Sequence, residues 1–342
     1  MTTPADQPGS TRAPRNIHIV SAGYLRRFGV DGHVMVHDVA TGESKRRGVR
    51  AVARRRDWWG TEPGLSEVVE TSFNQCESPA LRSLRALDKD WALTAESRAL
   101  LAQFIAIHVV RTPAFGTFVR GTTEAAIDDF RDRGTIAPES FDGAADLFRR
   151  PRMHANTLLG QITRIASLFC SMQWVLVRFN EDLLITSDQP VVALPCMPPG
   201  RQANAAAVPP TGWVDTVEIR FPLDPKTLLL MTWSDDEDPP APLDGGFNQA
   251  CNINASLSQQ ADKEWFFRPD TFPHRLAPPL LRPLVLPISS ELLGRYTAVD
   301  ARGSKRRGAA NELIEQILRE NGPRDVVRWV TATRKRHADA GQ

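Results

Sequence analysis

Hydrophobic residues follow a helical spacing over much of the first half of the chain. Leu81, Leu84 and Leu87 recur every three residues, and Ser97 to Val110 is a long apolar stretch preceded by Thr94, a residue type that often caps a helix. Pro113 marks a break in this pattern. Further helices are predicted from Thr117 to Arg133, from Pro151 to about Met172, from Phe247 to Phe267, from Asn311 to Arg319 and from Asp325 to Lys335.

Short apolar runs bounded by turn residues dominate from Trp174 onwards. The runs Trp174–Arg178 and Leu183–Thr186 flank Asn180-Glu181-Asp182 and predict two strands joined by a tight turn. Residues Val217 to Phe221 and Thr227 to Trp233 repeat this pattern around a proline-containing turn, and Val34–Val39 with Lys45–Val52 predicts a hairpin that turns at Asp38–Gly42. Loops are expected from Pro195 to Gly212 and from Pro273 to Pro287.

Helices that cluster before strand pairs are typical of the α+β class. We therefore predict a mixed helical bundle packed on a mainly antiparallel sheet, in a single compact domain of residues 16–342. Residues 1–15 have almost no apolar side chains, so they are expected to form a disordered tail.

The charge balance is close to neutral, because 42 Lys and Arg face 40 Asp and Glu. The whole molecule is thus no polycation. Four dispersed cysteines without a Cys-x-x-Cys pair argue against a disulfide framework and a zinc site. No signal-peptide pattern and no apolar run of ~20 residues is present, so a cytoplasmic location without membrane contact is expected.

The segment Thr186-Ser187-Asp188-Gln189-Pro190 ends a predicted strand, where folds often expose reactive groups. Ser187 is a candidate nucleophile and Asp188 a candidate base, although the same side chains suit a hydrogen-bonded turn. His18 is a candidate general acid or base because its ordinary pKa lies near neutrality. The alternative is a structural histidine that caps the turn at Tyr24.

Glu77 and Arg111 are charged residues in apolar surroundings, so they either pair with each other or bind substrate. Asn254 lies in a predicted helix, where a hydrogen bond in the core is the alternative to substrate contact. His33 and His37 share one strand face without a third ligand. No metal and no cofactor is therefore expected.

Basic residues crowd the segment after the predicted hairpin and lead into an aromatic pair. Arginines and an adjacent indole suit RNA phosphates and stacked bases, although a solvated arginine-rich surface has the same composition. The candidate RNA-binding residues are Arg46, Arg47, Arg50, Arg54, Arg55, Arg56 and Trp58.

Several of these segments, in this order, resemble the family known as domain of unknown function 4238. They are His18 with Tyr24-Leu25-Arg26-Arg27-Phe28, Glu77, Gln103-Phe104-Ile105, Arg111-Thr112-Pro113, Trp174, Thr186 to Pro190, Phe221-Pro222-Leu223 and the segment from Asn254 to Phe267. Arginine-containing cyclodipeptide synthases of fungi look like distant members of that family. This sequence lacks the Asp-x-x-x-Glu pattern associated with the fungal enzymes.

The resemblance implies a tRNA-dependent aminoacyl transferase that forms a peptide bond or a cyclic dipeptide from aminoacyl-tRNA. Catalysis is then expected from His18, Glu77, Arg111, Ser187 and Asp188, and substrate binding from Tyr24, Arg27, Gln103 and Asn254. The alternatives are a metal-dependent hydrolase or nuclease and a non-catalytic RNA-binding or defence module. On any of these hypotheses, His18, Glu77 and the Ser187-Asp188 strand end should face one cavity.

Overall fold

A computed structural model of the chain describes residues 16–56, 58–59, 62, 64–91, 93–133, 138–195, 216–232, 238 and 241–271. The predicted N-terminal tail, the loops from Cys196 to Gly212 and from Pro273 to Pro287, and the two C-terminal helices lie outside the described residues.

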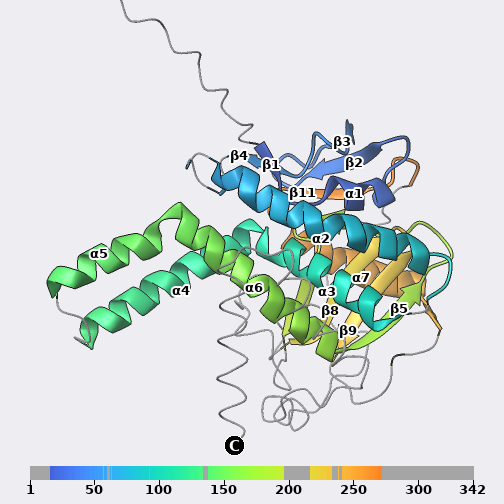
Figure 1. The fold of residues 1–342 in the computed structure, drawn as a ribbon. Coiled ribbons are helices and arrows are strands. Elements are labelled where there is room, and N and C mark those ends of the chain that lie inside the picture. Colours follow the sequence, from blue (N-terminus) through green and yellow to red (C-terminus); the bar gives the residue numbers. More distant parts are fainter. Residues whose placement is uncertain are drawn as a thin grey trace, which may run out of the picture.

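The larger sheet has the order β10-β5-β9-β8-β7 (Figure 1). Its strands are β5 (Gln173–Arg178), β7 (Val192–Pro195), β8 (Thr216–Asp224), β9 (Thr227–Thr232) and β10 (Leu243–Asp244). Only the short β10–β5 pair is parallel among these strands. Side chains alternate along β9, and both of its faces are buried, as expected for a sheet covered on two sides.

A second sheet, with the order β3-β2-β11-β6, is fully antiparallel. It contains β2 (His33–Asp38), β3 (Ser44–Gly48), β6 (Thr186–Ser187) and β11 (Glu264–Phe267). A separate two-stranded ribbon joins β1 (Asn16–His18) to β4 (Arg54–Arg56). The ribbon therefore brings the start of the described chain beside the arginine-rich segment.

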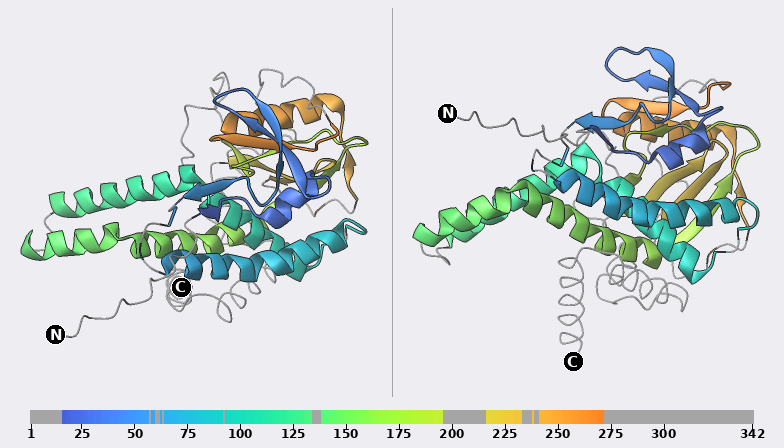
Figure 2. Two further views of the ribbon diagram at one scale, coloured as in Figure 1. Left: turned by 90° about the horizontal axis from the view of Figure 1, so that it is seen from above. Right: turned by 45° about the horizontal axis from the view of Figure 1, so that its top comes forward.

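Helices cover one face of the larger sheet, and one helix covers the other. The helical elements of the described chain are α1 (Ala22–Leu25), the 3-10 turn η1 (Arg26–Phe28), α2 (Leu65–Leu87), α3 (Ala95–Val110), α4 (Pro113–Asp132), α5 (Pro138–Arg149), α6 (Pro151–Ser171) and α7 (Phe247–Gln260). The apolar α3 is buried over most of its length between α2 and α6. Helices α4 and α5 project from the body as an arm (Figure 2).

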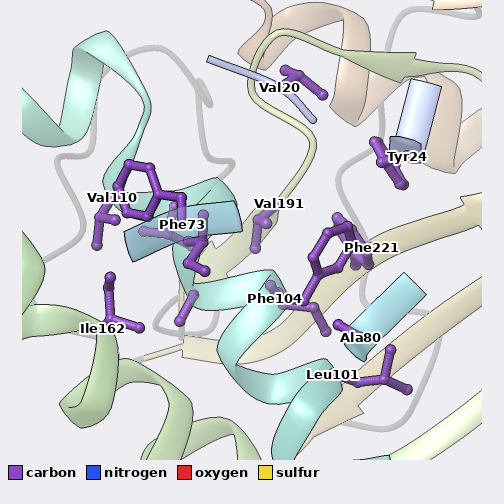
Figure 3. Close-up of a cluster of buried hydrophobic side chains, with 14 of the residues drawn as sticks. Val20, Tyr24, Phe73, Ala80, Leu101, Phe104, Val110, Ile162, Val191 and Phe221 are labelled. Atoms are coloured by element: carbon purple, nitrogen blue, oxygen red, sulfur yellow. The ribbon is translucent and has the colours of Figure 1, made fainter. Parts of the chain in front are cut away.

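The main hydrophobic core lies between the helices and the larger sheet. Figure 3 shows Tyr24, Phe104 and Phe221, which come from α1, α3 and β8. The rings of Tyr24 and Phe221 stack with centroids 5.1 Å apart, and Phe104 meets Tyr24 edge-on at 6.2 Å. Such contacts add to the free energy of apolar burial and fix how α1 sits on the body.

The structure confirms the α+β class, the hairpin and the Thr94 helix cap, but three local predictions were wrong. Leu183–Thr186 does not pair with Trp174–Arg178, because β5 pairs with β9 while β6 joins β11 in the other sheet. Helix α7 ends at Gln260 and the apolar residues after it form β11. Pro113 opens α4 rather than preceding it, since proline is tolerated in the first helical turn.

Candidate functional site

A cleft of about 250 Å³ lies where the end of β1, α1 and the middle of α2 meet. Its lining is mostly polar or charged. The residues are His18, Ser21, Ala22, Gly23, Arg26, Glu70, Asn74, Glu77, Ser78, Leu81 and Arg111. Three residues predicted to be catalytic, His18, Glu77 and Arg111, therefore share one cleft.

Helical periodicity explains how α2 supplies so many of these side chains. Glu70 and Glu77 are seven residues apart, two turns of helix, so they project from the same face. Phe73, between them, packs into the core. The face that borders the cleft thus carries two carboxylates over an apolar base.

Arg111 connects both carboxylates to the end of α3. Its guanidinium hydrogen-bonds Glu77, lies 3.4 Å from Glu70 and stacks over the Phe73 ring at 4.1 Å. The Arg111 side chain is almost fully buried, and its Nε has no hydrogen-bond partner among the described residues. The predicted Glu77–Arg111 pair is confirmed, and it forms part of the cleft wall.

Burial raises the pKa of Glu70 against the opposing charge of Arg111 and the hydrogen bond from Trp59. The Trp59 Nε1 donates to Glu70 at 3.5 Å. A carboxylate in this environment takes up a proton more readily than an exposed one.

His18 lies at the end of β1, where its Nε2 is 3.1 Å from the backbone carbonyl oxygen of Arg50. Burial lowers the pKa of His18, and the positive charges of Arg54 and Arg111 act in the same direction. The imidazole is therefore mainly neutral at pH 7 and is available as a proton acceptor.

His108, on α3, supports the cleft from beneath. Its Nδ1 donates to the Phe104 carbonyl at 2.8 Å, which leaves Nε2 to accept from the backbone N–H of Ser21 at 3.4 Å. The ring is completely buried between Tyr24 and Phe104, and this burial lowers the pKa of His108 to about 4. A neutral imidazole thus holds the cleft-lining Ser21 in place.

Ser187 and Asp188 lie outside the lining of this cleft, which corrects the expectation of one shared cavity. The Asp188 carboxylate accepts backbone N–H groups of Asp262 and Lys263 at 2.8 Å and the guanidinium of Arg55 at 2.9 Å. Both residues are buried, and the Ser187 hydroxyl accepts from the Gln189 N–H. The Ser187 bond closes a local turn, whereas the Asp188 carboxylate joins the end of β6 to Arg55 and to the backbone before β11.

Asp188 still influences the cleft, because Arg55 belongs to β4, the partner strand of β1. A second contact, from the Ala53 N–H to the Glu264 carboxylate at 3.1 Å, holds the same ribbon against β11. Ala53 has a positive φ of 51°, a conformation that favours glycine, so this contact stabilises a strained turn.

The four predicted substrate-binding residues are also absent from the cleft lining. The Tyr24 hydroxyl bonds Thr186 Oγ1 at 2.8 Å and donates to Pro222 O at 2.7 Å. Asn254 accepts from Ile185 N–H and donates to Leu183 O, so it fixes the segment before β6. Gln103 is buried on α3, and its amide has no hydrogen-bond partner within the described part of the chain.

Arg27 faces away from the cleft and is held by two carboxylates. It contacts Asp88 through both terminal nitrogens, at 2.8 and 2.6 Å, and Asp224 at 3.0 Å. Its neighbour Arg26 lines the cleft instead and is exposed. The two adjacent arginines therefore serve different surfaces.

The predicted RNA-binding residues are only partly available to a ligand. Arg46, Arg47, Arg50, Arg54 and Arg56 are exposed along β3, β4 and the turn between them. Arg55 instead forms ion pairs with Asp188 and Asp262. Trp58 is half-buried and packs against Gly116, so its indole contributes to the fold.

Within the described ranges, no group of three His, Cys, Asp or Glu side chains is arranged to hold a metal ion. His37 hydrogen-bonds Ser44 and stacks on Trp265 at 4.3 Å, while His33 bonds Asp31. No single helix among the described residues has the length and apolar character needed to cross a bilayer, although α3 and α4 meet those criteria together as a pair bent by 73°.

Sequence reasoning missed Ser21, Arg26, Glu70, Asn74 and Ser78 as cleft residues, and His108 as their support. The seven-residue spacing of Glu70 and Glu77 was visible in the sequence and indicates a shared helix face. Nothing in the local sequence links Ser21 to His108, which lies 87 residues further on.

Comparison with known proteins gives one match. A family model described as a protein of unknown function, DUF4238, matches residues 16–271, which include every residue of the cleft. No curated protein and no solved structure matches the chain, so the resemblance to cyclodipeptide synthases has no counterpart in these comparisons.

Proposed function

This chain belongs to the DUF4238 family, and we propose that it is an aminoacyl transferase that uses aminoacyl-tRNA as its acyl donor. The observation that carries the proposal is the arrangement of opposite charges. In the cleft, the carboxylates of Glu70 and Glu77 share the single guanidinium of Arg111, and beside the cleft lie a ribbon and hairpin with exposed arginines. A substrate that joins an ammonium group to a polyanion complements both surfaces.

An aminoacyl ester of tRNA has this combination of charges. Its α-ammonium suits Glu70 and Glu77, since a cation near carboxylates is stabilised in a partly buried cleft. The tRNA phosphates suit the exposed arginines of β3 and β4, which contribute salt-dependent affinity. Arg111 is a positioning residue here, because its guanidinium is occupied by both carboxylates.

The proposed reaction transfers the acyl group to an amine. The acceptor nitrogen attacks the ester carbonyl carbon while the neutral His18 imidazole takes a proton from that nitrogen. The carbon–oxygen ester bond then breaks, and the departing ribose oxygen of the tRNA receives the proton from His18 and becomes a hydroxyl. The products are an amide and a free tRNA, so no ATP is consumed. Arg26, exposed and cationic at the cleft, is proposed to stabilise the negative charge on the carbonyl oxygen.

The test is a single-turnover assay with mixed radiolabelled aminoacyl-tRNAs and the purified full chain. His18→Ala is expected to lower the transfer rate by roughly 10²-fold or more, the usual contribution of a general base. His33→Ala is the matched control, because that imidazole lies on β2 outside the cleft. Equal activity of the two variants would exclude His18 as the base.

Glu70→Gln tests the carboxylate role and retains an acceptor for the Trp59 N–H. We expect weaker binding of aminoacyl-tRNA but unchanged binding of uncharged tRNA, because only the ester carries the ammonium group. Binding of tRNA that persists with no turnover of any aminoacyl ester would favour the non-catalytic RNA-binding alternative and overturn the proposal.

A further inference from the structure

A second concave surface lies beyond the cleft, at the C-terminal end of α2. It has a volume of about 300 Å³ and is formed where the C-terminal end of α2 meets the ends of β5, β8 and β9. Its base is apolar, with Leu84, Leu87, Leu176, Phe179 and Leu223. Trp91, half-buried, forms one edge. This volume suits a single small molecule, because larger drug-like ligands occupy pockets of several hundred Å³ or more.

Two carboxylates, from Asp88 and Asp224, line this groove. Arg27 bridges Asp88 and Asp224, so one positive and two negative charges leave a net charge of −1 there. The Arg27 Nε also donates to the Leu223 carbonyl at 2.7 Å, which anchors the group to β8. The side chain of Asp88 remains 44% exposed and can accept a further hydrogen bond.

Positive charge comes from Arg178 and Lys226, and the Lys226 backbone N–H donates to the Asp224 carboxylate at 2.8 Å, so the two signs of charge lie close together. The Lys226 ammonium donates to the Asn180 carbonyl at 3.0 Å, a neutral partner, and neither residue forms an ion pair within the described residues. Arg178 and Thr227 are paired across β5 and β9, so these cations stand at the ends of adjacent strands. The groove therefore presents charges of both signs beside an apolar base.

We propose that this groove binds a free α-amino acid with a large apolar side chain. The carboxylate lies toward Lys226 and Arg178, the ammonium toward Asp88 and Asp224, and the side chain packs on Leu87 and Trp91. Ligands with only one charge can contact groove charges of only one sign, and ligands without an apolar group leave the apolar base exposed to water.

Ligand-observed NMR titration of the full chain with L-phenylalanine tests this proposal. Phenylalaninamide, which lacks the carboxylate, and 3-phenylpropanoate, which lacks the ammonium, should each bind about tenfold more weakly, since a partly exposed charge-assisted contact contributes roughly that factor. Glycine should show no binding at the same concentrations.

Two variants and one control locate the ligand. Trp91→Ala and Lys226→Gln should each weaken L-phenylalanine binding by about tenfold, the first through lost packing and the second through lost charge. Lys226→Gln replaces an exposed side chain, so it keeps the test valid if Trp91→Ala does not fold. Asn74→Ala, in the cleft, should leave binding unchanged.

Three results would overturn the proposal. They are no detectable binding of L-phenylalanine at millimolar concentrations, equal affinity for the amide or the deaminated acid, and loss of binding in Asn74→Ala but not in Lys226→Gln. Binding in this groove is measured without tRNA. Failure of the transferase reaction in the cleft therefore leaves the result intact.

Discussion

The buried imidazole of His108 should make the protein lose stability in acid. In the unfolded chain its pKa is near 6.5, and burial lowers the folded value to about 4. A histidine with a depressed folded pKa binds fewer protons when folded than when unfolded, so acid favours unfolding between the two values. The pKa difference of about 2.5 corresponds to about 3 kcal/mol of unfolding free energy.

Most of this loss falls between pH 6.5 and pH 4, so a comparison of pH 7 with pH 4.5 captures about 2 kcal/mol. Other groups titrate in the same range. Burial raises the pKa of Glu70 and Asp188, so protonation of these two carboxyl groups in acid raises the free energy of unfolding. Their contribution opposes that of His108. The charges of Glu77 and Arg111 also face the His108 ring. The difference between the wild-type protein and a variant without the imidazole isolates the contribution of His108.

The assay is urea denaturation of wild-type protein, His108→Gln and His33→Gln at both pH values. His108→Gln should be roughly 1 to 3 kcal/mol less stable at pH 7 but should lose about 2 kcal/mol less than wild type on acidification. His33→Gln replaces an exposed ring and should follow the wild-type pH dependence. An identical acid-induced loss in His108→Gln and wild type would refute the reasoning.

Three further substitutions test contacts in the fold by urea denaturation. Asp188→Asn should cost about 1 to 3 kcal/mol, since both carboxylate oxygens accept backbone N–H groups and the amide supplies only one acceptor oxygen; an unchanged midpoint would contradict this. Thr94→Ala should cost about 1 kcal/mol because the capping box with Ser97 is lost, and an unchanged midpoint would count against that cap. Gly116→Ala should cost about 1 to 3 kcal/mol, because the new Cβ would lie 2.6 Å from the Trp58 ring; a stabilised variant would show that the indole moves freely.

Local patterns predicted those elements whose cause is local. The Asp38–Gly42 turn and the Thr94 cap depend on neighbouring residues, and both formed as expected. The partner of β6 was not predictable in this way, because its apolar residues fit either sheet and the partner strand β11 lies about 80 residues further on. The same limit applies to α7, where Trp265, Phe266 and Phe267 continue an apolar pattern but extend a sheet.

The sequence predicted part of the cleft but not all of it. Glu77 and Arg111 are charged residues in apolar surroundings, where each charge needs a partner, and this requirement correctly predicted their ion pair. Asp188 was placed among the reactive residues because it follows a strand, yet its carboxylate is used by a turn at Asp262 and Lys263. Sequence alone does not distinguish a carboxylate that meets a substrate from one that meets a backbone.

The ion pair between Asp188 and Arg55 affects how mutational data on this family should be interpreted. A two-stranded ribbon has little stability of its own, so the location of His18 depends on what anchors β4. Loss of the anchor would displace the imidazole while leaving every cleft side chain chemically intact. An activity screen would then score position 188 as severely as the base itself, and only a structure or a pH profile would reveal that the aspartate acts from a distance.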